Sequence, residues 1–139
     1  MKDHITAVLP RTLPKPQGFS YGFEVKHGRL VFIAGQVARD GNNVVVGKGD
    51  VVAQFRQVCA NIQAVMNAAG GEMTDIVKLT IYVLDVNDYR KSLREVGAVY
   101  REYFGKHFPA MTLVGARDLF DAADGCLIEI EGVAALAPS

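Results

Sequence analysis

The chain has 139 residues, a length that favours one domain over two small ones. Half of the residues are apolar and 22% are charged, and 15 basic side chains balance 15 acidic ones, so the formal net charge is zero. This balance argues against a general binder of nucleic acid or of anionic membranes, because both need a basic excess to attract phosphates. The apolar stretches are far shorter than the roughly 20 residues that span a bilayer.

The N-terminal stretch and the two cysteines indicate the cellular compartment. Residues 1–10 contain only a short apolar run and lack the apolar core of a secretory signal. Cys59 and Cys126 form no CxxC pair and lie in apolar segments, so we expect buried free thiols rather than redox or metal ligands. These features favour a cytoplasmic protein.

Turn residues and hydrophobic spacing predict an N-terminal arm and a single domain. Three of the five prolines precede Gly18, which indicates an extended arm over residues 1–17, followed by a domain over residues 18–139. Gly28 is expected in a tight turn between the first two strands, and Asp50 at the cap of the first helix. The predicted elements are strands over 20–25, 30–36 and 44–46, a helix over 50–69, a strand over 76–84, a helix over 88–104, and strands over 111–116 and 126–135.

The order of these elements predicts an α+β fold in which a single mixed sheet carries two helices on one face. In the last strand, Ile128 and Ile130 point to one face, whereas Glu129 and Glu131 point to the other. The isoleucines fit beneath the helices. The opposite face is half apolar and half acidic, and we expect another subunit to bury it.

The pair Glu129 and Glu131 is the first candidate for catalysis. Two carboxylates at positions i and i+2 of a strand are commonly a solvated face. Because the rest of this strand is apolar, partial burial of one carboxylate is the alternative. Burial would raise its pKa and suit it to proton transfer near neutral pH.

The three histidines do not form a metal-binding pattern. His4, His27 and His107 are predicted in the arm, in a turn and in the loop after a helix, without an HxH or HExxH spacing. We therefore expect surface or capping roles for them, no metal site and no cofactor. Gly47-Lys48-Gly49-Asp50 also lacks the spacing of a phosphate-binding loop.

Seven short segments, in the right order, resemble the Rid proteins, also called YjgF (reactive intermediate deaminases), over about residues 18–136. The strand that ends in Ala34-Gly35-Gln36 resembles the family's SGQ strand. Phe108-Pro109-Ala110 resembles its FPAR signature, and Ile128-Glu129-Ile130-Glu131 its IEIE strand. The remaining matches are Gln54 and Asn61, Ala68-Ala69-Gly70, Asp75-Ile76-Val77-Lys78, and Asp85-Val86-Asn87-Asp88-Tyr89.

The resemblance implies the chorismate-mutase-like fold, with the order ββαβαββ, which agrees with the elements predicted above. It also implies a homotrimer in which the sheets form a central barrel and the ligand clefts lie between subunits. Studied members hydrolyse enamines and imines, such as 2-aminoacrylate, to ketoacids and ammonia. The partners implied for this chain are therefore two further copies and a small molecule.

Carried over position by position, the family's site is only partly present. Tyr21 matches a tyrosine near the N-terminal strand, and Glu129 matches the glutamate beside the water. Met111 occupies the position of the arginine that holds the substrate carboxylate, Ala34 that of the SGQ serine, and Gly97 that of a helical asparagine. Loss of a bidentate arginine contact weakens binding of a small 2-imino acid, whereas methionine offers an apolar wall. Alternatively, Met111 belongs to the core.

Three functions are compatible with these residues. We favour hydrolysis of an enamine, imine or related unsaturated metabolite that is larger or less dependent on its carboxylate than 2-aminoacrylate. Glu129 would activate water, Tyr21 would orient the ligand, and Arg117 or Lys78 is a candidate replacement for the missing cation. The alternative is a non-catalytic, metabolite-binding homotrimer. The third is the ribonuclease activity once attached to the family, which needs a basic surface.

Overall fold

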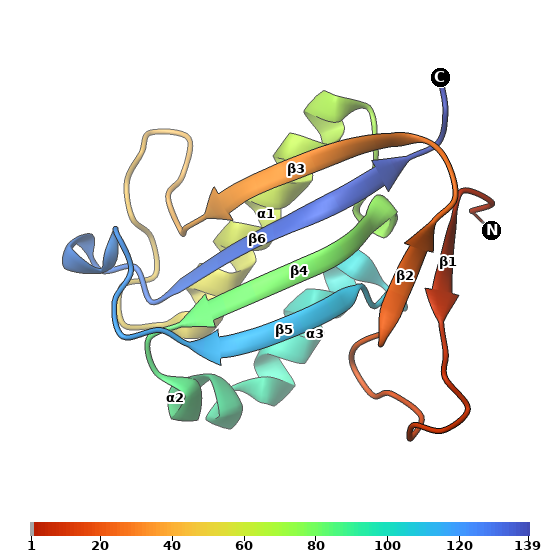
Figure 1. Cartoon of the computed structure of the whole chain (residues 1–139). Coiled ribbons are helices and arrows are strands. Elements are labelled where there is room, and N and C mark those ends of the chain that lie inside the picture. The colour runs from red at the N-terminus through yellow and green to blue at the C-terminus, as the bar shows by residue number, and fades with distance from the viewer. Residues whose placement is uncertain (1) are drawn as a thin grey trace.

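A four-stranded mixed sheet, with helices packed on one of its faces, forms the body of the protein (Figure 1). The computed structural model describes residues 2–139. The strand order is β3-β6-β4-β5, in which β6 runs antiparallel to both neighbours and β5 runs parallel to β4. These strands are β3 (Arg29–Gln36), β4 (Ile76–Val83), β5 (Ala110–Gly115) and β6 (Ile128–Leu136).

The first helix begins and ends as predicted. The side chain of Asp50 accepts hydrogen bonds from two backbone N–H groups of the first turn, and Gly70 ends the helix with a φ of 81°. The helical elements are α1 (Val51–Ala69), α2 (Val86–Lys91) and α3 (Leu93–Phe104), together with the short 3-10 turns η1 (Met73–Asp75) and η2 (Ala122–Asp124).

The second predicted helix differs from the structure in its start and its continuity. The carboxylate of Asp85 caps it by accepting the N–H of Asp88, so it begins before Asp88. At Ser92 the backbone leaves the helical region, with φ −100° and ψ 9°, and divides the segment into α2 and α3. The short strand predicted over 44–46 is reduced to an isolated bridge between Arg39 and Val45.

The main core lies between the helices and the sheet. Alternation along β4 and β6 directs the apolar side chains toward α1 and α3, and the buried residues of α1 face them. The α+β class and the helices on one face are therefore confirmed. The largest buried side chains of this core include Phe55, Ile62, Met66, Ile76, Leu79, Ile128 and Ile130.

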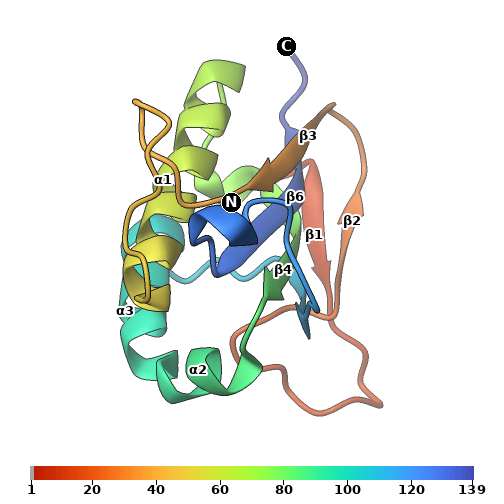
Figure 2. The same cartoon turned by 90° about the vertical axis from the view of Figure 1, so that its left-hand side faces the viewer.

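The sheet predicted as single is divided, because the first strand of the domain does not join β3. Instead β2 (Gly22–Val25) pairs antiparallel with β1 (Ile5–Val8), and the two form a ribbon on the side of the main sheet away from the helices (Figure 2). Gly28 permits this path. A Cβ there would overlap the carbonyl oxygen of Leu136, so glycine lets the chain cross close to the end of β6 rather than fold back as a hairpin.

The β1–β2 ribbon buries part of the sheet face for which the sequence predicts burial by another subunit. Ile5 and Phe23 pack against Val77, Val133 and Ala135 in a second, smaller apolar cluster. The rest of that face, nearer the Gln36 end of β3, is not covered by the ribbon (Figure 1). Leu30 and Phe32, which share this face of β3, are 52% and 75% exposed.

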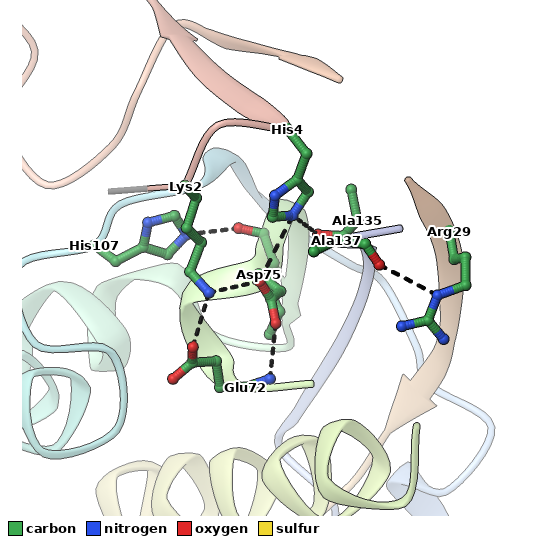
Figure 3. Close-up of polar contacts among 9 residues, drawn as sticks. Lys2, His4, Arg29, Glu72, Asp75, His107, Ala135 and Ala137 are labelled. Carbon is green, nitrogen blue, oxygen red and sulfur yellow. Dashed lines mark hydrogen bonds and ion pairs between the residues drawn. The ribbon is translucent and has the colours of Figure 1, made fainter. Parts of the chain in front are cut away.

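Polar contacts attach the start of the arm to the domain (Figure 3). Lys2 Nζ lies 2.8 Å from Glu72 Oε2 and 2.7 Å from Asp75 Oδ1. His4 Nε2 donates a hydrogen bond to the carbonyl oxygen of Ala135 at 2.7 Å. Asp75 is only 5% exposed, so Lys2 provides the counter-charge of a buried carboxylate.

Two histidines are more buried than expected. His4 is 5% exposed because β1 holds the arm against β6. His107 is partly buried, and its Nε2 donates to the carbonyl oxygen of Ile76 at 2.6 Å. Desolvation lowers the pKa of His107. His27, in the turn before β3, is exposed as expected.

Both cysteines are free and buried, as predicted. Burial raises the pKa of Cys59 to about 12 and also raises that of Cys126. At neutral pH both thiols are therefore protonated. Within residues 2–139, none of the helices has the length and apolar character that crossing a membrane requires.

Candidate active site

Glu129 lies in a hollow of about 390 Å³ on the sheet face opposite the helices. Its neighbours Ile128 and Ile130 are buried in the main core, so the alternation of the strand directs Glu129 to the other side. We call this the Glu129 hollow. Its lining consists of Glu129, Gly35, Tyr82 and Glu131, with Ala116, Asp118, Leu119 and Phe120 from the segment that follows β5.

Gly35 makes room for the Glu129 side chain. A Cβ at position 35 would overlap the carboxylate and lie 2.9 Å from Cδ of Glu129. Gly35 is part of an irregularity between Ile33 and Gln36, where the register of β3 against β6 shifts. Gly35 belongs to the strand that resembles the family's SGQ segment, but the sequence alone predicts no role for it.

The two carboxylates of β6 differ in their electrostatic environment. Desolvation, followed by the negative charges of Asp121 and Glu131, raises the pKa of Glu129. Glu131 accepts a hydrogen bond of 2.5 Å from the hydroxyl of Tyr82, which raises the pKa of that tyrosine. Among residues 2–139, Glu129 has no such donor, so its carboxylate is available to a bound molecule.

Met111 and Gly97 lie together, but on the helix side of the sheet. Met111 is partly buried against the main core, and both residues line a cavity of about 240 Å³ between α1, α3 and the sheet. We call this the apolar cavity. Met111 therefore contacts the core and borders a cavity at the same time, and both interpretations of this residue describe part of its environment.

Tyr21 and Ala34 line neither the Glu129 hollow nor the apolar cavity. The Tyr21 hydroxyl donates to the carbonyl oxygen of Pro14 at 2.8 Å, and the ring of Phe19 packs edge-on at 5.2 Å. Tyr21 thus contacts the loop between β1 and β2. Ala34 is exposed on β3, next to Gly35.

Neither of the two cations that the sequence suggests lines the cavity beside Met111 and Gly97. Lys78 donates to the hydroxyl of Thr112 at 3.1 Å, across β4 and β5. Arg117 is exposed in the segment after β5. Arg101 instead lines the apolar cavity, and its Nη1 would be 3.4 Å from a Cβ at Gly97. The i,i+4 spacing of Gly97 and Arg101 on α3 was the available signal.

One chain thus holds two separate groups of candidate residues. Glu129 faces one side of the sheet, and Met111 with Gly97 faces the other. The first group can accept a proton from water, and the second can receive an apolar group. Within one chain, the sheet separates the two groups.

The family described as endoribonuclease L-PSP matches residues 14–136. The chain belongs to this family, which is the Rid/YjgF family. The resemblance based on short segments is therefore confirmed, together with the chorismate-mutase-like fold. This Rid chain is similar in structure to a Rid-family protein of unknown function from Yersinia pestis, with a TM-score of 0.83 and 35% identity, over 96% of this chain and 99% of that one.

Sequence relatives of this Rid chain include proteins with a named activity. It is 39% identical over 127 residues to a RutC family protein from Pyrococcus horikoshii, covering 91% of this chain and 94% of the relative. It is 31% identical over 118 residues to a human protein named 2-iminobutanoate/2-iminopropanoate deaminase, covering 85% of this chain and 81% of the relative.

Proposed function

We propose that this protein hydrolyses imines or enamines in clefts between the subunits of a homotrimer. The observation that carries the proposal is the Glu129 hollow, in which a carboxylate with a raised pKa and no donor of its own lies beside a glycine that gives it room. The relatives named 2-iminobutanoate/2-iminopropanoate deaminase support the reaction class.

Exposed apolar side chains on the sheet support the proposed homotrimer. Leu30 and Phe32 of β3 and Val114 of β5 are exposed apolar residues, and such residues favour burial against a further copy. Contact between copies would also bring Glu129 of one chain toward Met111 of its neighbour, which one chain alone cannot do.

The proposed reaction needs one proton acceptor. Water adds to the carbon of the C=N bond, and Glu129 accepts a proton from that water and returns it to the nitrogen, which gives a carbinolamine. The O–H proton then moves to the departing nitrogen, so that one imine and one water yield one carbonyl compound and one ammonia. An enamine first tautomerises to the imine by protonation at carbon. Tyr21 is proposed to orient the ligand.

Specificity is proposed to differ from that of relatives with an arginine after the FPA segment. Met111 offers no charge to a substrate carboxylate, so a small 2-imino acid loses a charge-assisted contact. This same substitution favours the second candidate function, a homotrimer that binds a small metabolite without turning it over.

Substitution of each strand glutamate tests the proposal. Ammonia and ketoacid release is measured from freshly generated imines, with wild type, Glu129→Gln and the matched control Glu131→Gln. We expect Glu129→Gln to lose at least about 100-fold in kcat/KM, the usual contribution of a general base, and Glu131→Gln to retain most of the activity. Equal activity of Glu129→Gln and wild type would remove Glu129 from the mechanism. Ligand binding without turnover in wild type would favour the non-catalytic candidate.

A further inference from the structure

The apolar cavity is large enough to receive part of a ligand. Its volume is about 240 Å³, and an engineered apolar cavity of roughly 150 Å³ holds a benzene molecule. Its walls come from α1, α2, α3 and the helix-facing side of the sheet. Representative wall residues are Cys59 and Ile62, Leu79 and Ile81, and Val96 and Phe104.

The polar atoms inside the cavity carry no charge at neutral pH. Burial raises the pKa of Cys59 to about 12 and that of Tyr89 to about 12. The hydroxyl of Tyr100 already donates to the carbonyl oxygen of His107 at 2.7 Å. The interior therefore accepts an apolar group and disfavours an ionised one.

Gly97 leaves space on the cavity side of α3. A Cβ built there meets only Nη1 of Arg101 within 4 Å, at 3.4 Å. Glycine in the middle of a helix is less favourable than alanine, so the position gives up helix stability and leaves this space open. Met111 borders the same space with an unbranched, adaptable side chain.

Positive charge borders the opening. Arg101 and Lys106 are exposed and line the cavity together with Gly105. Arg101 has no ion-pair partner among residues 2–139. A guanidinium in this position can donate two parallel hydrogen bonds to a carboxylate. The opening is therefore suited to an anion, and the interior to an apolar group.

We propose that the apolar cavity is the side-chain subsite for a 2-imino acid with a branched aliphatic or aromatic side chain, and that Arg101 holds the carboxylate of that substrate. This rests on the proposed hydrolysis and names its substrate class. In such a complex the side chain enters between α1 and α3, and the C=N carbon stays outside, where Glu129 of a neighbouring copy can reach it.

The first experiment compares substrates that differ only in their side chain. Imines are generated in situ from phenylalanine, leucine and alanine by an amino-acid oxidase, and the rate of imine hydrolysis is followed. We expect kcat/KM to be at least about 10-fold higher for the phenylalanine and leucine imines than for the alanine imine. Gly97→Leu should remove this difference. Ala98→Leu, a matched change at an exposed position on the same helix, should preserve it.

The second experiment measures binding without turnover. Titration calorimetry with phenylpyruvate and pyruvate should give at least about 10-fold tighter binding of phenylpyruvate. Arg101→Gln should weaken the binding of both acids, whereas Arg94→Gln, an exposed arginine of α3 that does not line the cavity, should not. Gly97→Leu should remove the advantage of the phenyl group alone.

The two experiments separate this inference from the proposed function. If all three imines are hydrolysed alike and both acids bind alike, the subsite is excluded while hydrolysis by Glu129 stands. If wild type hydrolyses none of the imines but binds phenylpyruvate tightly, with loss of that preference in Gly97→Leu, the subsite stands as part of a binding protein. Equal binding of both acids, or a preference that persists in Gly97→Leu, overturns the inference.

Discussion

The backbone of Gly35 lies against the side chain of Glu129, so closely that a Cβ at position 35 would be 2.9 Å from Cδ of the glutamate. The two residues are on adjacent strands, β3 and β6, at the point where the register between those strands shifts. The place of the carboxylate in its hollow therefore depends on the absence of a side chain on the neighbouring strand.

Gly35→Ala tests this relationship. The φ of Gly35 is in the region that any residue adopts, so the added methyl acts through its volume rather than through backbone strain. We expect a loss of about 10-fold or more in kcat/KM, because the carboxylate has to move, and a change of less than about 1 kcal/mol in the free energy of unfolding. A variant as active as wild type would show that the carboxylate position is not critical.

The acid side of the pH–activity profile should report the raised pKa of Glu129. Glu129 acts as a base when it is ionised, so kcat/KM should fall as the pH drops through a pKa above the ordinary 4.5. Glu131→Gln removes one of the charges that raise this pKa, and the acid limb should move to lower pH. Desolvation is the largest cause of the raised pKa, so this movement should be small. An acid limb at the same pH in both proteins would show that the charge of Glu131 does not contribute.

The same shift has a consequence for stability. The pKa of Glu129 is raised in the folded state, so folding favours its neutral form. The contribution is present below the unfolded value and is lost as the pH rises through the folded pKa. At neutral pH, Glu129→Gln should therefore be at least as stable as wild type, as measured by urea unfolding.

The anchoring of the arm predicts a difference between two histidines. His4→Ala removes a buried ring and its hydrogen bond to Ala135, and should cost about 2 kcal/mol in the free energy of unfolding. His27→Ala, at an exposed turn, should change it by less than about 0.5 kcal/mol. Lys2→Met should also destabilise, by about 1 kcal/mol, because it leaves the buried Asp75 without its counter-charge. Similar stability of both histidine variants in urea would argue against the arm being part of the folded unit.

The proposed trimer depends on the exposed face of the sheet. Phe32→Glu places a charge where an apolar contact is expected, and should convert the trimer to monomers in sedimentation at micromolar concentration. Val44→Glu, at an exposed apolar residue in the loop before α1, is the matched control and should leave the trimer intact. A monomeric wild-type protein would contradict the proposed assembly.

Local patterns were sufficient for the elements and for much of the core. The alternation Ile128, Glu129, Ile130 assigned the faces of β6, because a buried face demands a period of two. Helical spacing and the Asp50 cap located α1. The faces of β6 and the position of α1 depend on residues that are close together in the chain, so a single sequence is enough to predict them.

Long-range contacts account for what the sequence did not predict. The passage of Gly28 over Leu136 depends on a strand that ends more than a hundred residues later, and it separates β2 from β3. The burial of His4 depends in turn on β1. The sequence does not predict this strand, because the prolines of the arm indicate an extended segment outside the domain. Arg101 was not predicted for another reason: its position matters only in relation to a cavity whose walls come from three helices and the sheet.

The outer edge of β5 has a consequence for how the protein is made. Among residues 2–139, the partner along this edge is a single bridge from Ser20 to Ala110, next to a hydrogen bond from the Ser20 N–H to the carbonyl oxygen of Pro109. The remaining backbone donors and acceptors of the edge are open to another strand. Newly synthesised chains can therefore pair with one another along this edge, and at high protein concentration refolding competes with aggregation.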